Sequence, residues 1–161
     1  MKLFSIQRGV YMKKIDLNSI KIEAESYFKD EGLSCSESVL KALVNNFEMN
    51  VNSEIVKTAS GFSGGMGGSG CTCGTISGAI IAIGLLFGRS EGSDPSIRKA
   101  KELSKEVHDK FKEEHNATCC RSLTRGLKPG TSERLNQCCY FVGEVAYETS
   151  KIIAEELNIK Y

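Results

Sequence analysis

The sequence predicts an all-α protein, a single-domain bundle of five to six helices around an apolar, glycine-rich central helix. Length and composition support one folded domain, because the chain has 161 residues and 40% of them are hydrophobic, enough to build a core. Apolar residues recur at helical spacing in most segments, and no stretch alternates as a strand does. The chain contains only two prolines, so few elements are interrupted.

The charge balance and the lengths of the apolar runs limit which partners and which cellular compartment we expect for this protein. With 21 cations against 20 carboxylates, the net charge of +1 argues against a nucleic-acid-binding protein. The longest apolar run, Ile76–Phe87, is shorter than the roughly 18–20 residues of a membrane span, so we expect no membrane insertion. Gln7 and Arg8 interrupt the apolar region that a secretory signal needs. We expect a cytoplasmic protein, with residues 1–17 as a poorly ordered extension and residues 18–161 as the folded domain.

The first two helices are recognised by their ends. A helix is expected from about Ser19 to Phe28, and Gly32 follows as a break. Ser34 and Glu37 have the spacing of a capping box, in which two side chains satisfy backbone N–H groups at a helix N-terminus. An apolar stripe follows directly. A second helix is therefore expected to begin here, with Cys35 at its first position.

Glycines separate a long loop from the central helix. A short helix opened by Ser53 is expected to end by Gly61, and residues 61–88 hold ten of the sixteen glycines. The first half of this segment is expected to be a loop, because so many glycines oppose helix formation entropically. The second half, residues 75–88, is apolar on all sides and is predicted to be a central helix surrounded by the others. Small residues spaced four apart would let another backbone approach closely: Gly70, Gly74, Gly78 and Ala82.

Two longer helices complete the bundle. Asp94 is expected as the N-cap of one, with Pro95 at its first helical position, and this helix is expected to end near His115. The last helix is expected from about Ser132 to Leu157, after a Pro-Gly break. The turn between these two helices carries two adjacent cysteines.

Seven cysteines are the most informative residues. An odd number of cysteines in a cytoplasmic protein does not indicate a disulfide framework, so metal ligands, redox thiols and small buried hydrophobic residues are the alternatives. A helix N-terminus carries partial positive charge that favours thiolate over thiol. Cys35 and Cys73 are both expected at such N-termini. Thiolates converging from four regions of the chain would hold a metal centre. The seven are Cys35, Cys71, Cys73, Cys119, Cys120, Cys138 and Cys139.

One motif resembles that of a known family. The run Cys73-Gly74-Thr75-Ile76-Ser77-Gly78 is similar to the CGAxxG element of the redox-active C_GCAxxG_C_C proteins, with Thr75 in place of the usual alanine. The resemblance extends from roughly Ala24 to Glu156. It includes Cys35 before an apolar helix, the glycine run before Cys73 and two later cysteine segments.

The later segments each contain two cysteines, so Cys119 or Cys120, and Cys138 or Cys139, match the family's third and fourth positions. Leu123 follows Cys120 at the expected offset and an apolar residue lies one helical turn beyond Cys138, which favours these two. The resemblance implies redox activity, and a related domain of split-Soret cytochrome c is associated with a [2Fe–2S] cluster. The haem-attachment pattern C-x-x-C-H is absent here. The cofactor and metal ligands implied are Cys35, Cys73, Cys120 and Cys138.

We therefore expect a redox-active protein whose four cysteines bind a [2Fe–2S] cluster and pass single electrons to a protein partner. The second hypothesis is enzymatic, namely thiol–disulfide exchange by the same cysteines, and it requires a cysteine with a lowered pKa. The third is a non-catalytic helical interaction module, dimeric through its small-residue helix, whose cysteines only pack. Structural zinc is disfavoured because the usual paired cysteine knuckles are missing.

The remaining candidates have simpler explanations. Cys71, Cys119 and Cys139 are expected to be packing or accessory thiols. A charged helix surface explains His108 and His115, with a ligand role for His115 as the alternative because it precedes the third cysteine segment by four residues. The glycine loop lacks the Lys-Ser/Thr of a P-loop and follows no strand, so no nucleotide is expected.

Overall fold

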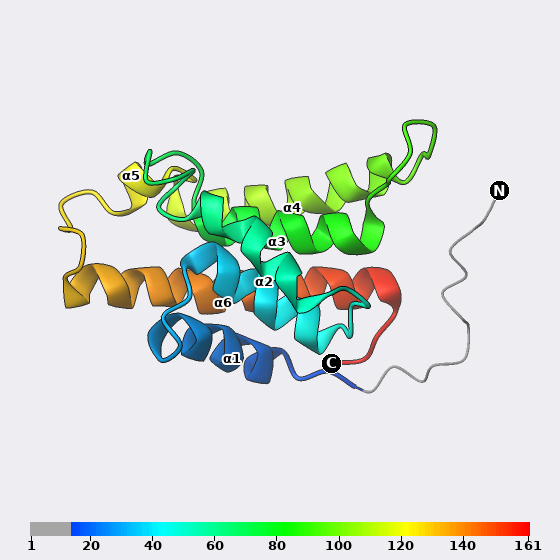
Figure 1. Cartoon of the computed structure of the whole chain (residues 1–161), viewed down its shortest axis with the longest axis horizontal. Helices are drawn as coiled ribbons and strands as arrows, with labels where there is room; N and C mark the ends of the chain where they lie inside the picture. The colour runs from blue at the N-terminus through cyan, green and yellow to red at the C-terminus, as the bar shows by residue number, and fades with distance from the viewer. Residues whose placement is uncertain (1–13) are drawn as a thin grey trace.

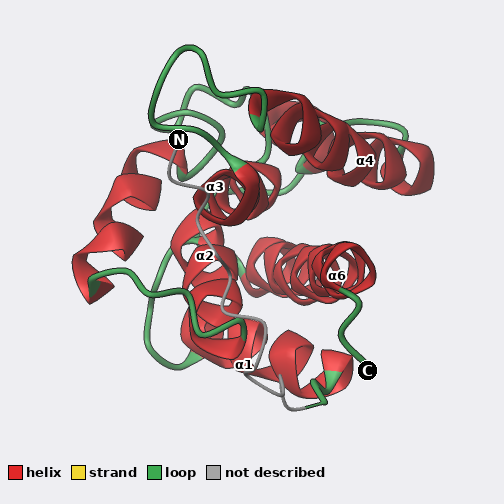
Figure 2. Cartoon of the chain, turned by 90° about the vertical axis from the view of Figure 1, so that its right-hand side faces the viewer, coloured by secondary structure: helices red, strands yellow, loops and turns green. Residues whose placement is uncertain are grey.

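The computed structural model describes residues 14–161, and over this range the chain is helical without a β-strand (Figures 1 and 2). One domain contains six α-helices and one 3-10 helix: α1 (Leu17–Lys29), α2 (Cys35–Asn46), η1 (Ser53–Phe62), α3 (Gly74–Phe87), α4 (Ile97–His115), α5 (Cys120–Leu123) and α6 (Ser132–Leu157). The predicted all-α class is confirmed. No helix in this range is both long and apolar enough to span a membrane.

Most of the expected N-terminal extension, residues 1–13, lies outside the described residues. Within the described part, Ile15 and Leu17 are buried. The Ile15 N–H donates to the Lys160 carbonyl at 3.1 Å, which joins the two ends of the described chain. The packed part of the chain therefore includes residues ahead of residue 18.

Capping side chains set the starts of the first two helices. The Asp16 carboxylate accepts hydrogen bonds from two backbone N–H groups in the first turn of α1, at 2.9 and 3.1 Å. At the start of α2, the Ser34 N–H donates to the Glu37 carboxylate at 2.7 Å, as the capping-box spacing predicts. Cys35 is therefore the first residue of α2, and its position is confirmed.

The central helix, α3, leaves one face open. Ile76, Ala79 and Ile83 are fully buried, whereas Ile80 is 37% exposed and Gly84 faces solvent. This differs from the all-round burial that its apolar sequence predicts. The reason is the position of α1, which packs on α2 and α6, so α3 is covered mainly by α2, α4 and α6.

Helix α4 begins two residues later than predicted. The Asp94 carboxylate accepts a hydrogen bond from the Ser96 N–H at 2.8 Å, but this closes a turn, and the first helical residue is Ile97. Asp94 therefore acts in an Asx turn ahead of the helix and not as its N-cap. The helix ends at His115, as predicted, and Asn116 follows in the left-handed conformation with φ 54°.

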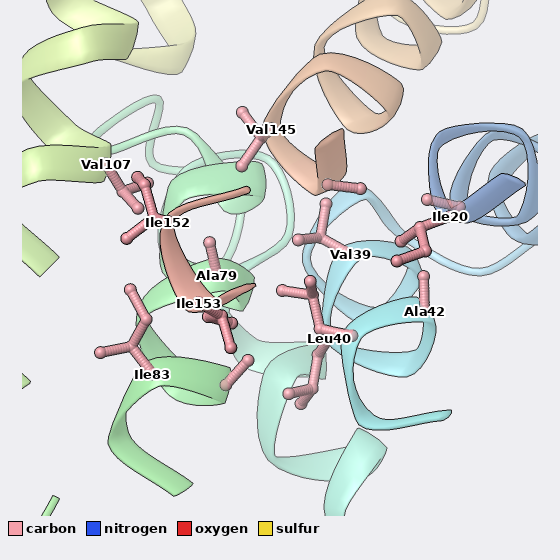
Figure 3. Close-up of a cluster of buried hydrophobic side chains, with 14 of the residues drawn as sticks. Ile20, Val39, Leu40, Ala42, Ala79, Ile83, Val107, Val145, Ile152 and Ile153 are labelled. Carbon is pink, nitrogen blue, oxygen red and sulfur yellow. The ribbon is translucent and has the colours of Figure 1, made fainter. Parts of the chain in front are cut away.

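The core lies between α2, α3 and α6, where their apolar side chains meet (Figure 3). Val39, Leu40, Ile83, Ile152 and Ile153 are at most 2% exposed. Each such side chain contributes about 1.5–3 kcal/mol by leaving water. One end of the molecule brings together five segments: the end of α1, the start of α2, the loop before α3, α5 and the start of α6 (Figure 1).

Candidate functional site

An isolated backbone bridge brings two of the predicted cysteines together. Thr72, in the loop before α3, pairs antiparallel with Cys119, just before α5. The Cys73 N–H donates to the carbonyl that precedes Cys119 at 2.8 Å, and the Cys120 N–H donates to the Cys71 carbonyl at 2.6 Å. These bonds hold the backbones of Cys73 and Cys120 side by side, although the two residues are far apart in sequence.

The glycine-rich loop is shaped by contacts that leave no space for side chains. Gly65 has φ 73°, a left-handed conformation, and a Cβ there would lie 2.6 Å from the Cys71 carbonyl oxygen and 2.8 Å from the Cys120 Cβ. A Cβ at Gly70 would lie 3.0 Å from the Cβ of Arg121. The loop therefore lies directly against the start of α5 only because glycine occupies these positions.

Cys35 reaches the same place because α2 and α3 are in close contact. A Cβ at Gly74 would lie 2.5 Å from the Cys35 sulfur, and one at Gly78 would lie 2.3 Å from the Ser36 carbonyl oxygen. The small-residue spacing thus allows a close backbone approach, as predicted. Since α2 of the same chain fills this face, a homodimer would have to use another surface.

The four predicted cysteines line one cavity. Its volume is about 160 Å³, roughly ten times the ~10–15 Å³ that a single water needs. Cys35 comes from the start of α2, Cys73 from the residue before α3, Cys120 from the start of α5 and Cys138 from the first half of α6. The other lining residues are Phe28, Ser34, Ser63, Gly64, Thr75, Leu123, Thr124, Arg134 and Phe141.

The other three cysteines lie elsewhere. Cys71 and Cys119 are exposed, and neither lines the cavity. Cys139 is buried against α1, with its sulfur 3.9 Å from the Glu25 carbonyl oxygen. Successive residues of a helix point about 100° apart, so Cys138 and Cys139 cannot face the same cavity. The cavity thus contains one cysteine from each adjacent pair.

Burial raises the pKa of three cavity thiols. The pKa of Cys73 is raised to about 12, first by burial and then by the neighbouring Cys35, while the Thr75 hydroxyl, 3.2 Å from the sulfur, acts in the opposite direction. The pKa values of Cys35 and Cys138 are raised by burial and by the cysteines that face them. The pKa values of Cys35 and Cys73 are thus raised and not lowered as their places at helix N-termini predict, because burial outweighs the hydrogen bonds that favour the thiolates.

Arg134 is a cavity residue that the sequence analysis missed. It lies one helical turn before Cys138 on α6. Burial raises the pKa of Cys138, and the positive charge and hydrogen bond of Arg134 oppose this effect. The guanidinium also donates to the Leu127 carbonyl at 3.5 Å. The spacing of a cation four residues before a predicted ligand on one helix is the signal that points to it.

The two histidines lie outside the cavity lining. His108 contacts Asp109 at 2.9 Å, and His115 contacts Glu144 at 2.6 Å. The His115 ring also packs on Phe141, one of the cavity residues, with 4.8 Å between ring centroids. Within residues 14–161, no three His, Cys, Asp or Glu side chains are arranged to hold a metal ion.

Comparison with known proteins agrees with the cysteine pattern. Residues 33–152 match the family described as "Putative redox-active protein (C_GCAxxG_C_C)". The chain is also similar to a protein of Archaeoglobus fulgidus that carries the name "Uncharacterized protein", with 25% identity over 134 residues, which cover 79% of this chain and 89% of that one. No solved structure matches the chain. The matched range covers well over half of the chain and contains all four cavity cysteines, so this protein belongs to the C_GCAxxG_C_C family.

Proposed function

We propose that this protein is an electron carrier whose four cavity thiols hold a [2Fe–2S] cluster. The observation that carries the proposal is the convergence of Cys35, Cys73, Cys120 and Cys138 on a single cavity from four separate elements. Membership of the family supports redox activity in general terms. Four thiolates are the usual ligand set of such a cluster, which accepts and returns single electrons when bound.

The donor set and the cavity volume suit a cluster, and the described thiols are not gathered around one point as a single ion requires. A zinc ion needs its sulfur ligands about 2.3 Å from one common point. No group of three ligand side chains in residues 14–161 has an arrangement of that kind. A [2Fe–2S] core contributes its own bridging sulfides, so its four thiolates stand further apart. The cavity of about 160 Å³ leaves room for such a core between the thiols.

Several groups of the chain are suited to stabilising charge on the sulfurs. The Gly64 backbone contacts the Cys35 sulfur, and the Thr75 hydroxyl lies 3.2 Å from the Cys73 sulfur. Arg134 adds a positive charge to the same cavity. Hydrogen bonds and charges around ligand sulfurs tune the reduction potential of a bound centre. Phe28 and Phe141 contribute apolar rings to the cavity lining.

Thiol–disulfide exchange by the same cysteines is less well supported. The attacking group in such exchange is a thiolate. Burial raises the pKa of Cys35, Cys73 and Cys138, which keeps these thiols protonated at neutral pH. The two exposed thiols, Cys71 and Cys119, do not line the cavity. These observations favour the cluster-binding function over the enzymatic one.

The experiment is anaerobic reconstitution of the full chain with ferrous iron and sulfide, followed by iron and acid-labile sulfide analysis. We expect about two irons and two sulfides per chain, and an EPR signal on reduction. Cys120→Ala and Cys138→Ala should lose both elements. Cys119→Ala and Cys139→Ala are matched controls, because each alters the sequence neighbour of a cavity cysteine, and they should keep them. A chain without iron and sulfide, or equal losses in the controls, would refute the proposal.

A further inference from the structure

We propose that a cationic surface beside the cavity docks an acidic electron-transfer protein. This surface, called the α5 surface below, consists of α5, the loop after it and the start of α6. The inference rests on the proposed electron-carrier function and adds the class of its partner. The cations of the α5 surface are Arg121, Arg125, Lys128 and Arg134.

The positive charges of the α5 surface are not neutralised by carboxylates. Arg121, Arg125 and Lys128 are exposed. In the part of the chain that the structure describes, none of the four cations forms an ion pair with a carboxylate. Between residues 119 and 135 the only carboxylate in the sequence is Glu133. Four positive charges are thus concentrated in a short segment of a chain whose net charge is only +1.

Three of the five lysines of α4 show the contrast. Lys99 pairs with Glu156 at 3.0 Å, Lys110 pairs with Glu106 at 3.2 Å, and Lys105 forms an ion pair with a carboxylate one turn along the helix. Cations whose charge is already balanced in this way attract a partner weakly. The unpaired cations beside the cavity therefore attract an acidic protein more strongly than these three lysines do.

The α5 surface adjoins the cavity, because several of its residues line it. It lies near the end of the molecule where α6 begins (Figure 1). Cys120 and Thr124 line the cavity, and each is followed in sequence by an exposed arginine, Arg121 or Arg125. Arg134 itself lines the cavity. A partner seated on this surface would contact residues adjacent in sequence to the cavity lining, a closeness that suits electron transfer.

Hydrogen bonds hold the α5 surface in place on both sides. The Arg121 guanidinium donates to the Ser69 carbonyl in the glycine-rich loop at 2.9 Å. On the other side, the Gln137 amide of α6 donates to the Leu123 carbonyl of α5 at 2.9 Å. A preformed surface limits the ordering cost of binding. Small interfaces with low ordering cost are typical of brief encounters between redox proteins.

The residues among the cations favour a protein partner over a nucleic acid. Leu135 is 49% exposed beside Arg134, and Leu127 is half-buried beside Lys128. Protein interfaces combine such apolar contacts with complementary charge. Binding of single-stranded nucleic acid uses aromatic stacking, and residues 117–139 contain no aromatic side chain. An oligonucleotide is therefore the competing outcome of the test.

The test measures binding of the full chain to a plant-type ferredoxin, an acidic one-electron carrier, by calorimetry at low and at physiological salt. The double variant Arg121→Glu/Arg125→Glu is compared with Arg98→Glu/Lys101→Glu, which makes the same change in net charge at exposed positions near the start of α4. We expect wild-type affinity to fall as salt rises. The first variant should lose about tenfold or more in affinity, and the second should match the wild type.

Three results would overturn the docking proposal. They are absence of salt-sensitive ferredoxin binding by the wild type, equal losses in both double variants, and binding of a single-stranded oligonucleotide in place of ferredoxin. Iron content is measured on the same samples, and binding is repeated with the iron-free chain. A wild-type chain that binds no iron would contradict the electron-carrier function. A chain with its full iron content that does not bind ferredoxin would contradict the docking proposal alone.

Discussion

At the level of single residues, burial divides the seven cysteines into two groups. Cys71 and Cys119 are exposed, and the other five are buried or half-buried. The rate at which a thiol is alkylated depends on its access to reagent and on its thiolate fraction. Both factors slow the reaction of Cys73, which is buried and whose pKa is raised to about 12.

Alkylation of the iron-free native protein should follow this division. We expect iodoacetamide to modify Cys71 and Cys119 first and Cys73 at least about tenfold more slowly, as followed by peptide mass spectrometry over time. In concentrated urea the seven rates should converge, which provides the control. Rapid modification of Cys73 in the native protein would show that the cavity is open to reagent.

At the level of helices, α3 contains two glycines with opposite expected responses to the same methyl group. In Gly78→Ala, the added Cβ would lie 2.3 Å from the backbone oxygen of Ser36, so we expect a loss of about 1–3 kcal/mol in the free energy of unfolding. In Gly84→Ala, nothing lies within 4 Å, and alanine should add up to about 1 kcal/mol as the better helix former. Urea unfolding curves measure both. A Gly78→Ala protein as stable as the wild type would contradict the close approach of α2 and α3.

Glu37 makes the N-terminus of α2 sensitive to pH. Its carboxylate accepts hydrogen bonds from the Ser34 N–H at 2.7 Å and from the Ser60 hydroxyl. Burial alone would raise the pKa of Glu37, but these hydrogen bonds outweigh it and hold the pKa below its usual value. A carboxylate with a lowered pKa stabilises the fold above its unfolded pKa, and this contribution disappears as the pH falls through the folded pKa.

The Glu37→Gln variant isolates this charge, because glutamine keeps an acceptor oxygen. At pH 7 we expect the free energy of unfolding to fall by about 0.3–1 kcal/mol, since the negative charge at the helix N-terminus is lost. The difference from the wild type should shrink as the pH falls below about 4.3. Urea unfolding at pH 7 and at pH 3 measures it, and an equal difference at both values would show that the charge is not the cause.

Local chemistry explains which elements can be predicted from the sequence. The capping pair Ser34 and Glu37 acts within one helical turn, so the start of α2 is predicted correctly. Asp94 carries the same kind of signal, but its side chain closes an Asx turn, and α4 begins later than expected. The open face of α3 could not be predicted, because it depends on which distant helices cover it. The family resemblance singles out Cys120, but the bridge between Thr72 and Cys119 that brings it to the cavity joins remote segments and could not be predicted.

At the level of the whole molecule, the core extends well beyond the cavity. Its cluster of buried residues draws on α1, α2, α3, α4 and α6. Cys73 and Phe141 belong to both the cluster and the cavity lining, whereas Cys120 and Cys138 lie outside the cluster. The iron-free chain should therefore have a helical circular dichroism spectrum and unfold cooperatively. A ligand that binds only the folded state adds to its stability, so reconstituted protein should melt at a higher temperature. An unfolded iron-free chain would show that the core alone does not hold the fold.

Loading of the cavity should depend on pH, because only thiolates act as ligands and the thiols must release protons on binding. Burial raises the pKa of Cys35, Cys73 and Cys138, so these thiols are protonated at neutral pH in the iron-free chain. We expect reconstitution to be slower and less complete at pH 6.5 than at pH 8.5. Iron content after a fixed time measures this, and the same yield at both values would contradict the raised pKa values.

The pairing of Thr72 with Cys119, together with the place of Cys138 in the last helix, has a consequence for biosynthesis. Cys35 leaves the ribosome long before Cys138, and the walls of the cavity do not meet until α6 has emerged. In a nascent chain the four thiols are therefore still separate and do not yet form one binding site. For the cluster that we propose, iron delivery would therefore follow translation and act on the finished bundle.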